Sequence, residues 1–165
     1  MNNYYQDAGF FLREASNKIY KNIEKAEVIQ ISINLALGLE RILKGILYDI
    51  NPVYIYIEPK FDNTVQFIYK KNLVIKSGEG LASKTNEDVI TFKNSLLRSE
   101  CVSDTTNKNR SLLFKIEHIR DILAHCDLSF LDIEDTKLLI LRDFYPLLKS
   151  YSNELKIPSK HIFDN

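Results

Sequence analysis

One segment of the sequence, residues 27–50, carries apolar side chains around most of a helical circumference. A helix that is apolar on nearly all sides is stable only where other elements cover it, so this one is expected at the centre of the fold. Asn51 and Pro52 end it, because the residue before a proline avoids helical backbone angles. The remaining elements therefore have to pack around this helix.

Helical periodicity recurs on both sides of the central segment, and the 165-residue chain has only 5 glycines and 4 prolines to interrupt it. Apolar residues spaced three and four apart predict further helices over residues 7–25, 86–98, 110–126 and 133–156. Residues 103–109 are polar and are predicted to form a loop. A chain of this length is expected to form a single domain, 1–165. The pattern predicts an all-α fold, an up-and-down antiparallel bundle of four to five helices.

Residues 53–76 depart from this pattern. Two stretches, 53–57 and 65–69, are rich in β-branched and aromatic residues, and a turn-like stretch that contains Pro59 lies between them. This arrangement predicts a small β-hairpin inserted into the bundle. An irregular loop or a short helix fits the same residues equally well.

Charge and cysteine content limit the classes of protein to which the chain can belong. Lys and Arg total 22, as do Asp and Glu, so the net charge is zero and any contact with nucleic acid has to come from a local patch. The 2 cysteines form neither a disulfide framework nor a metal-ligand spacing. The sequence lacks a signal-peptide pattern, and it lacks an apolar run of the roughly 20 residues that cross a bilayer. We expect a cytoplasmic protein that contacts no membrane.

The most informative segment is residues 117–127, within the predicted helix 110–126. At about 100° per residue, one side of this helix should face the core and nearly the opposite side should face away. Arg120 lies on the flank of the core side, and Asp121 lies one turn before His125, where it can accept a hydrogen bond from the imidazole. The core side holds Leu112, Ile116, Ile119 and Leu123, and the outer side holds Phe114, His118, Asp121 and His125.

Each of these polar residues also has an ordinary structural explanation. An arginine at the edge of a core stripe commonly extends its guanidinium group to water. A histidine near a helix C-terminus interacts favourably with the helix dipole. Asp121 and His125 have the spacing of a common surface pair. The residue pattern alone therefore leaves a structural and a catalytic role open.

The central helix has a carboxylate, Glu40, in the middle of an apolar stripe. Burying a carboxylate is costly unless it is paired. Lys44, one turn later, is the local partner, and Arg120 from the 110–126 helix is the alternative. We expect the two helices to pack directly against each other, with Glu40 and Arg120 within salt-bridge or one-water distance. The stripe consists of Ile29, Ile33, Ala36, Leu43 and Leu47.

These two features together resemble a known family. Arg120-Asp121-Ile122-Leu123-Ala124-His125 resembles the signature of HEPN domains, which is an arginine, a polar residue, three spacers and a histidine. Glu40-Arg41-Ile42-Leu43-Lys44 resembles the Glu-x-x-x-Lys/Arg motif on the second helix of that family. The resemblance implies a helical bundle, commonly dimeric. Many HEPN domains are metal-independent endoribonucleases of toxin–antitoxin and phage-defence systems, and the motifs of two protomers form one composite site.

The resemblance also implies a role for each motif residue. His125 would act as general base or acid, because imidazole titrates near about pH 6.5. Arg120 would bind the scissile phosphate and stabilise the charge that develops on it. Asp121 would orient His125, and Glu40 with Lys44 would hold Arg120 from behind. The reaction would need neither metal nor cofactor, because the ribose 2′-hydroxyl is the nucleophile.

The candidate partners follow from the same resemblance: an RNA substrate, a second copy of the chain, and an antitoxin or sensor protein. Phe114 and Ile122 are apolar residues away from the core side, so they are predicted to form the dimer surface. Two alternatives stay open. One is a HEPN-like module that dimerises or binds nucleotides without catalysis, and the other is an unrelated helical bundle with an interaction role.

Charge is distributed unevenly around the motif helix. Acidic residues gather over 117–135, whereas Lys108, Arg110 and Lys115 lie at the other end of the helix and further lysines lie in the insertion. Scattered lysines usually mark a solvated face, but these groups could form a funnel for RNA in three dimensions. His118 is expected to matter little for catalysis.

Overall fold

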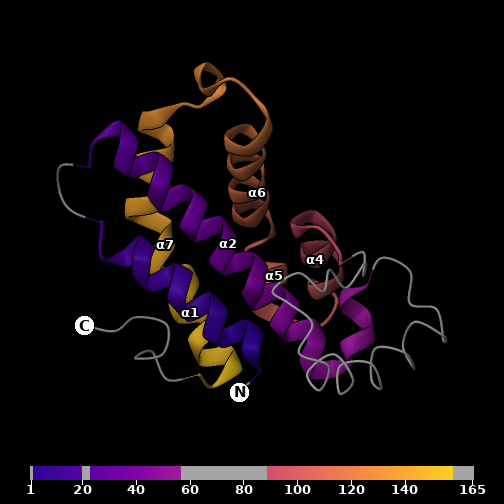
Figure 1. Ribbon diagram of the computed structural model, residues 1–165. Coiled ribbons are helices and arrows are strands. Elements are labelled where there is room, and N and C mark those ends of the chain that lie inside the picture. The colour runs from indigo at the N-terminus through magenta and orange to yellow at the C-terminus, as the bar shows by residue number, and fades with distance from the viewer. Residues whose placement is uncertain (1, 20–22, 57–88, 158–165) are drawn as a thin grey trace, which may run out of the picture.

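The computed structural model describes residues 2–19, 23–56 and 89–157, and these residues form an all-α helical bundle (Figure 1). The predicted fold class is confirmed. Within the described ranges the only β-type pairing is an isolated bridge between Tyr56 and Val89. The α-helices are α1 (Asn3–Ser16), α2 (Lys25–Ile50), α4 (Phe92–Ser99), α5 (Asp104–Lys108), α6 (Arg110–His125) and α7 (Ile133–Leu155), and two 3-10 helices are η1 (Pro52–Ile55) and η2 (Leu128–Phe130).

The central position predicted for the second helix is confirmed, because α2 packs against α1, α4, α6 and α7. In Figure 1, α2 crosses the molecule from end to end, with α1 along one side and α6 and α4 along the other. The direct packing expected between α2 and α6 is also present. Among the described helices, none is both long enough and apolar enough to span a bilayer.

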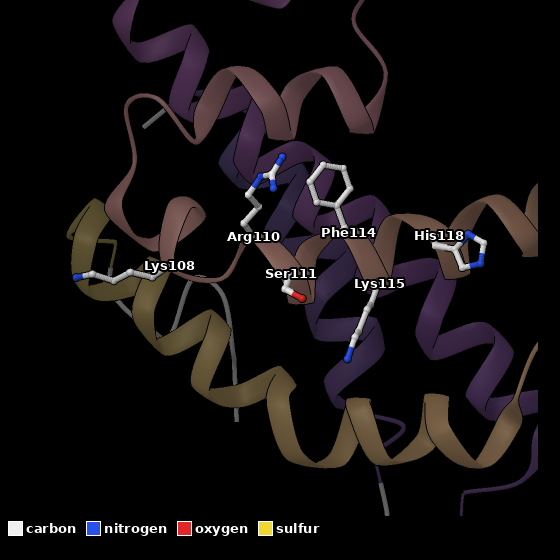
Figure 2. Close-up of a pocket in the computed structure, with 6 residues that line it drawn as sticks. All are labelled: Lys108, Arg110, Ser111, Phe114, Lys115 and His118. Carbon is white, nitrogen blue, oxygen red and sulfur yellow. The ribbon is translucent and has the colours of Figure 1, made fainter.

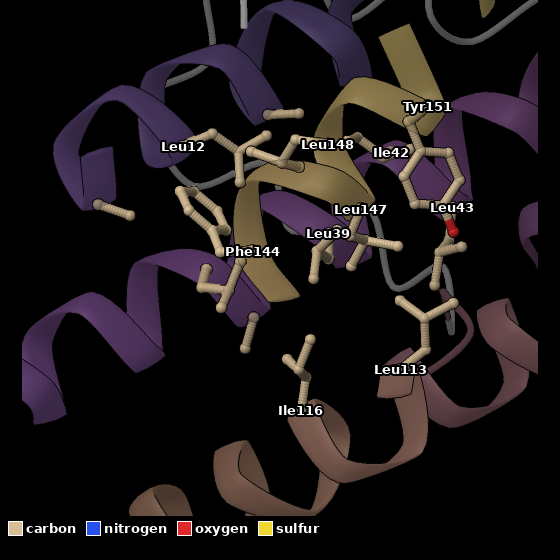
Figure 3. Packing of buried hydrophobic residues seen from close by; sticks show 14 of the residues in the cluster. Leu12, Leu39, Ile42, Leu43, Leu113, Ile116, Phe144, Leu147, Leu148 and Tyr151 are labelled. Carbon is tan, nitrogen blue, oxygen red and sulfur yellow. The ribbon is translucent and has the colours of Figure 1, made fainter. Parts of the chain in front are cut away.

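The main hydrophobic core lies where α1, α2, α6 and α7 meet. Leu12 and Leu43 are fully buried, and the large rings of Phe144 and Tyr151 fill the space between helices. Because α6 contributes its inner face to this core, its other faces remain available to solvent. Figure 3 shows Leu12, Leu39, Ile42, Leu43, Leu113, Ile116, Phe144, Leu147, Leu148 and Tyr151 converging from the four helices.

The first helix differs from the prediction at both ends, since α1 covers Asn3–Ser16 rather than residues 7–25. Asn2 starts it early by accepting a hydrogen bond from the Tyr5 amide at 3.3 Å. A capping box of Glu24 and Glu27 then starts α2. The apolar pattern continued past Ser16 because Ile19 and Ile23 reach the same core without being helical.

The predicted loop at residues 103–109 is wrong, because Asp104–Lys108 form α5. Ser103 caps this helix by accepting from the Thr106 amide at 3.1 Å, and the Thr106 hydroxyl lies 3.0 Å from the Tyr151 hydroxyl. These hydrogen bonds let a short polar segment fold against α7. Helix α5 sets the position of Lys108 relative to the start of α6, and both belong to the candidate site.

Where residues 53–57 are described, the short-helix alternative is confirmed in place of the predicted strand. Pro52–Ile55 form the 3-10 helix η1, and Asn51 caps it by accepting from the Val53 amide at 3.0 Å. The second predicted strand, 65–69, lies outside the described residues. The helix predicted over 86–98 begins at Phe92, because Thr91 caps it and Val89 pairs with Tyr56 instead.

Candidate functional site on helix α6

The orientation of α6 differs slightly from the prediction. Leu113, Ile116 and Ile122 are its buried residues, whereas Leu112 and Ile119 are only half-buried. The helix is therefore rotated so that Leu113 replaces Leu112 at the centre of the buried side. The outer side keeps His118 and His125 exposed to solvent.

This orientation removes the predicted dimer surface. Ile122 is 7% exposed, so it cannot contribute an open apolar patch. Phe114 is half-buried and packs against the main core, and the guanidinium carbon of Arg110 lies 5.0 Å from the centre of its ring. The exposed apolar residues near the motif are instead Leu128 and Phe130, which follow His125 in the chain and are 41% and 72% exposed.

Arg120 forms an ion pair with its own neighbour rather than with α2. Its Nη1 donates to Asp121 Oδ1 at 2.8 Å, and the two side chains are 35% and 45% exposed. Exposed pairs of this kind contribute little to stability. Arg120 therefore lies at the surface of the bundle, where an incoming anion can compete with Asp121.

Glu40 pairs with Lys44, the local alternative. Lys44 Nζ donates to Glu40 Oε1 at 2.5 Å, and the side chains are only 9% and 14% exposed. Within the described part of the chain, no ion pair joins Glu40 to Arg120. The resemblance implied that Glu40 and Lys44 position Arg120, but no ion pair among the described residues supports that role.

His125 is the last residue of α6 and is exposed. The hydrogen bonds of the described residues include none between Asp121 and His125, and the partner that Asp121 has is Arg120. The imidazole is thus open to a substrate but is not oriented by the neighbour expected for it. The three proposed catalytic residues, Arg120, Asp121 and His125, nevertheless lie within the last two turns of one helix.

A carboxylate that the sequence reasoning gave no role lies beside this group. The pKa of Glu117 is raised, first by burial and then by the negative charge of Asp121 one turn later, while Lys93 on α4 opposes the shift. The charge of Asp121 thus adds to the effect of burial on Glu117. The spacing of four residues between them was visible in the sequence, but the partial burial of Glu117 was not.

At the opposite end of α6 the structure has an open pocket with a cavity volume of about 610 Å³ (Figure 2). Its lining combines three cationic side chains with a serine, a phenylalanine and a histidine. The sequence placed the basic residues at this end of the helix and left open whether they form a funnel or an ordinary solvated face. The lining residues are Lys108, Arg110, Ser111, Phe114, Lys115 and His118.

Among the described residues, no three His, Cys, Asp or Glu side chains are grouped as a metal site would require. No family model, no curated protein and no solved structure matches the chain.

Proposed function

We propose that the protein is a metal-independent endoribonuclease of the HEPN type, in which Arg120 and His125 act on the phosphodiester backbone of RNA. The observation that carries this proposal is the position of these two residues. Both lie in the last two turns of α6, and neither is tied to the core: Arg120 is partly exposed and His125 is exposed. A phosphate can therefore reach either side chain without unfolding the bundle.

The chemistry uses only groups that the chain and RNA supply. The ribose 2′-oxygen attacks phosphorus, and an imidazole removes its proton. The bond from phosphorus to the 5′-oxygen breaks, and the leaving oxygen takes a proton. The products are a 2′,3′-cyclic phosphate and a 5′-hydroxyl. The Arg120 guanidinium releases its hydrogen bond to Asp121 and donates to two phosphate oxygens instead. It thereby stabilises the negative charge on them.

A second copy of the chain completes this mechanism. One imidazole cannot accept the proton of the 2′-hydroxyl and protonate the leaving oxygen at the same moment, whereas two His125 side chains related by a two-fold axis can. Leu128 and Phe130 lie beside His125 and are exposed, so a two-fold contact there would bury them. In this proposal they replace Phe114 and Ile122 as the dimer surface. A toxin or anti-phage effector of this type would be held inactive by an antitoxin or sensor protein.

One observation favours a second candidate, a HEPN-like module that assembles without catalysis. Asp121 pairs with Arg120 and leaves His125 without its orienting partner. If that arrangement persisted with RNA bound, the chain would bind a partner or nucleotide but would not cleave.

The deciding experiment is incubation of the purified protein with mixed RNA in the presence of EDTA. We expect cleavage that survives chelation and yields cyclic phosphate ends by mass spectrometry. His125→Ala should lose about 10²–10⁴-fold in rate, because general acid–base catalysis by one residue contributes that much. Cys126→Ser, at the next exposed position, is the matched control and should cleave normally. Cleavage that persists in His125→Ala, or that stops with EDTA and returns with magnesium, would falsify the proposal.

A further inference from the structure

We propose that the pocket at the start of α6 is a binding subsite for the phosphodiester backbone of single-stranded RNA, away from the bond that is cleaved. The choice of RNA as the ligand rests on the proposed function. The choice of a phosphate-bearing chain rests on the pocket itself, whose six lining residues include Lys108, Arg110 and Lys115 and no carboxylate.

The concentration of positive charge is local. The whole chain has zero net charge, yet three cations gather in this one pocket. Two carboxylates lie next to it. Glu100 accepts a hydrogen bond from Arg110 Nε at 2.8 Å. The pKa of Asp143 on α7 is lowered mainly by the hydrogen bond from Arg142, and the positive charge of Lys115 adds to this effect. Neither forms an ion pair with Lys108 or Lys115 within the described part of the structure.

Arg110 is held in a conformation suited to phosphate. Glu100 binds its Nε, and the Phe114 ring lies under the guanidinium with 5.0 Å between the guanidinium carbon and the ring centre. Figure 2 shows Arg110 and Phe114 extending together from α6. The Nη1 and Nη2 groups make no hydrogen bond to the other described residues, and their paired N–H groups match two phosphate oxygens. The outer face of the guanidinium can also stack on a base.

The pocket and the proposed cleavage site lie along the same side of α6. His118 lines the pocket, and His125 is seven residues further on, which returns it to nearly the same angle around the helix. Lys115 and His125 are separated by about 15 Å along the helix axis. A short single-stranded segment that enters at the pocket therefore runs past His118 to reach His125. An acidic peptide would meet the same cations, but it lacks the bases that Arg110 can stack against.

The test measures binding without cleavage. The probe is a fluorescein-labelled, 12-nucleotide RNA with 2′-O-methyl sugars, which has no free 2′-hydroxyl, and its affinity is measured by anisotropy over a range of salt concentrations. The variant Lys108→Gln/Lys115→Gln removes two pocket charges. The matched control Lys149→Gln/Lys156→Gln removes two exposed charges elsewhere. Circular dichroism confirms that both are folded.

We expect the pocket variant to reduce the slope of log affinity against log salt by about 1.4, because each single-strand phosphate contact contributes about 0.7. The control should leave the slope unchanged. Phe114→Leu keeps an apolar side chain against the core but removes the ring that supports the Arg110 guanidinium, and it should weaken binding about 2- to 5-fold. An unchanged slope, an equal fall in the control, or competition by polyglutamate as effective as that by RNA overturns the proposal.

Failure of the subsite and failure of the proposed function give different results. If the wild-type protein binds the probe through the pocket but cleaves no RNA, the subsite stands and the ribonuclease proposal fails. If cleavage depends on His125 while the pocket variant keeps both its affinity and its KM, the ribonuclease proposal stands and the subsite fails.

Discussion

At the scale of single residues, the decisive feature is the ion-pair partner of each motif charge. Glu40 and Arg120 each find a partner on their own helix, so the two motifs that resemble HEPN domains are not joined by an ion pair in the described structure. The buried pair Glu40–Lys44 belongs to the interior of the bundle, whereas Arg120–Asp121 belongs to its surface. The two pairs should therefore respond very differently to mutation.

We expect Glu40→Ala to lower the free energy of unfolding by about 3–5 kcal/mol, because it leaves the Lys44 ammonium group buried without a partner. Arg120→Ala should cost less than about 1 kcal/mol, since only an exposed pair is lost. Urea denaturation of both variants checks this. Equal losses in the two variants, with non-additivity in the double variant, would show that Glu40 and Arg120 interact after all.

The raised pKa of Glu117 gives a prediction for the pH dependence of stability. Because burial and Asp121 raise the pKa of Glu117, the folded state retains a proton that the unfolded chain releases at about pH 4.3. The stability contributed by Glu117 is therefore lost as pH rises from that value through the raised folded pKa. Glu117→Gln removes this loss, so its stability relative to the wild type should increase between pH 4 and pH 7.

Thermal denaturation at the two pH values measures this difference. Glu14→Gln, at an exposed position of α1, is the matched control and should show a smaller change. A Glu117→Gln variant whose relative stability falls with rising pH would contradict the assigned shift.

At the scale of secondary structure, side chains of α1 lie directly against two glycines of α2. A Cβ atom at Gly45 would lie 2.5 Å from Tyr5 Cε1, and one at Gly38 would lie 2.6 Å from Leu12 Cγ. Glycine is needed at both positions because the side chains of α1 occupy the space that a methyl group would fill.

We expect Gly45→Ala to destabilise the protein by about 1–3 kcal/mol through overpacking. Helix propensity alone would predict the opposite result, because alanine is more favourable than glycine inside a helix by about 1 kcal/mol. Gln30→Ala, at an exposed position of the same helix, should be neutral or stabilising. Urea denaturation shows whether Gly45→Ala lowers or raises the free energy of unfolding. A partial recovery of stability in Gly45→Ala/Tyr5→Leu would show that the Tyr5 ring is the obstacle. A stabilised Gly45→Ala would mean that α1 moves aside at little cost.

Local sequence signals predicted some elements accurately and missed others for identifiable reasons. The ends of α2, α6 and α7 came within two residues of their predicted positions, because long apolar patterns end there at strong boundary residues such as Pro52 and Asp132. α5 was missed because five polar residues carry no helical pattern. It is held by long-range hydrogen bonds, one of them from the Thr105 amide to Glu154 at 2.8 Å.

The candidate site, too, could be predicted only where a local sequence pattern contains its residues. Arg120, Asp121 and His125 were found because one helical motif contains them. The pocket itself could not be predicted, because Lys108 joins Arg110 and Lys115 in its lining through the fold of α5, which has no pattern in the sequence. The pairing of Glu40 could not be decided either, since Lys44 and Arg120 were both within reach by sequence and only the packing of α6 on α2 separates them.

At the scale of the whole molecule, α6 carries opposite electrostatic character at its two ends. The pocket at its start is cationic, while Glu117 and Asp121 add negative charge near its end. RNA would therefore be attracted to the start of the helix, and its approach to His125 would be opposed. Pairing two copies by a two-fold axis beside His125 would bring both Arg120 side chains to that end, but it would bring both copies of Glu117 and Asp121 with them, so Arg120 has to exchange Asp121 for phosphate before RNA can bind there.

The final prediction is that the protein is a homodimer whose contact includes Phe130. This ring is 72% exposed and lies in η2, five residues after His125. We expect light scattering at high micromolar concentration to show a dimer for the wild type and a monomer for Phe130→Asp, because the substitution places a charge in the apolar contact. Phe10→Asp alters another exposed ring, 57% exposed on α1, and should remain dimeric. If two His125 side chains form the site, the Phe130→Asp monomer should fold normally yet lose RNA cleavage. A wild-type protein that is strictly monomeric at this concentration, or a monomeric variant with full activity, would contradict the composite site.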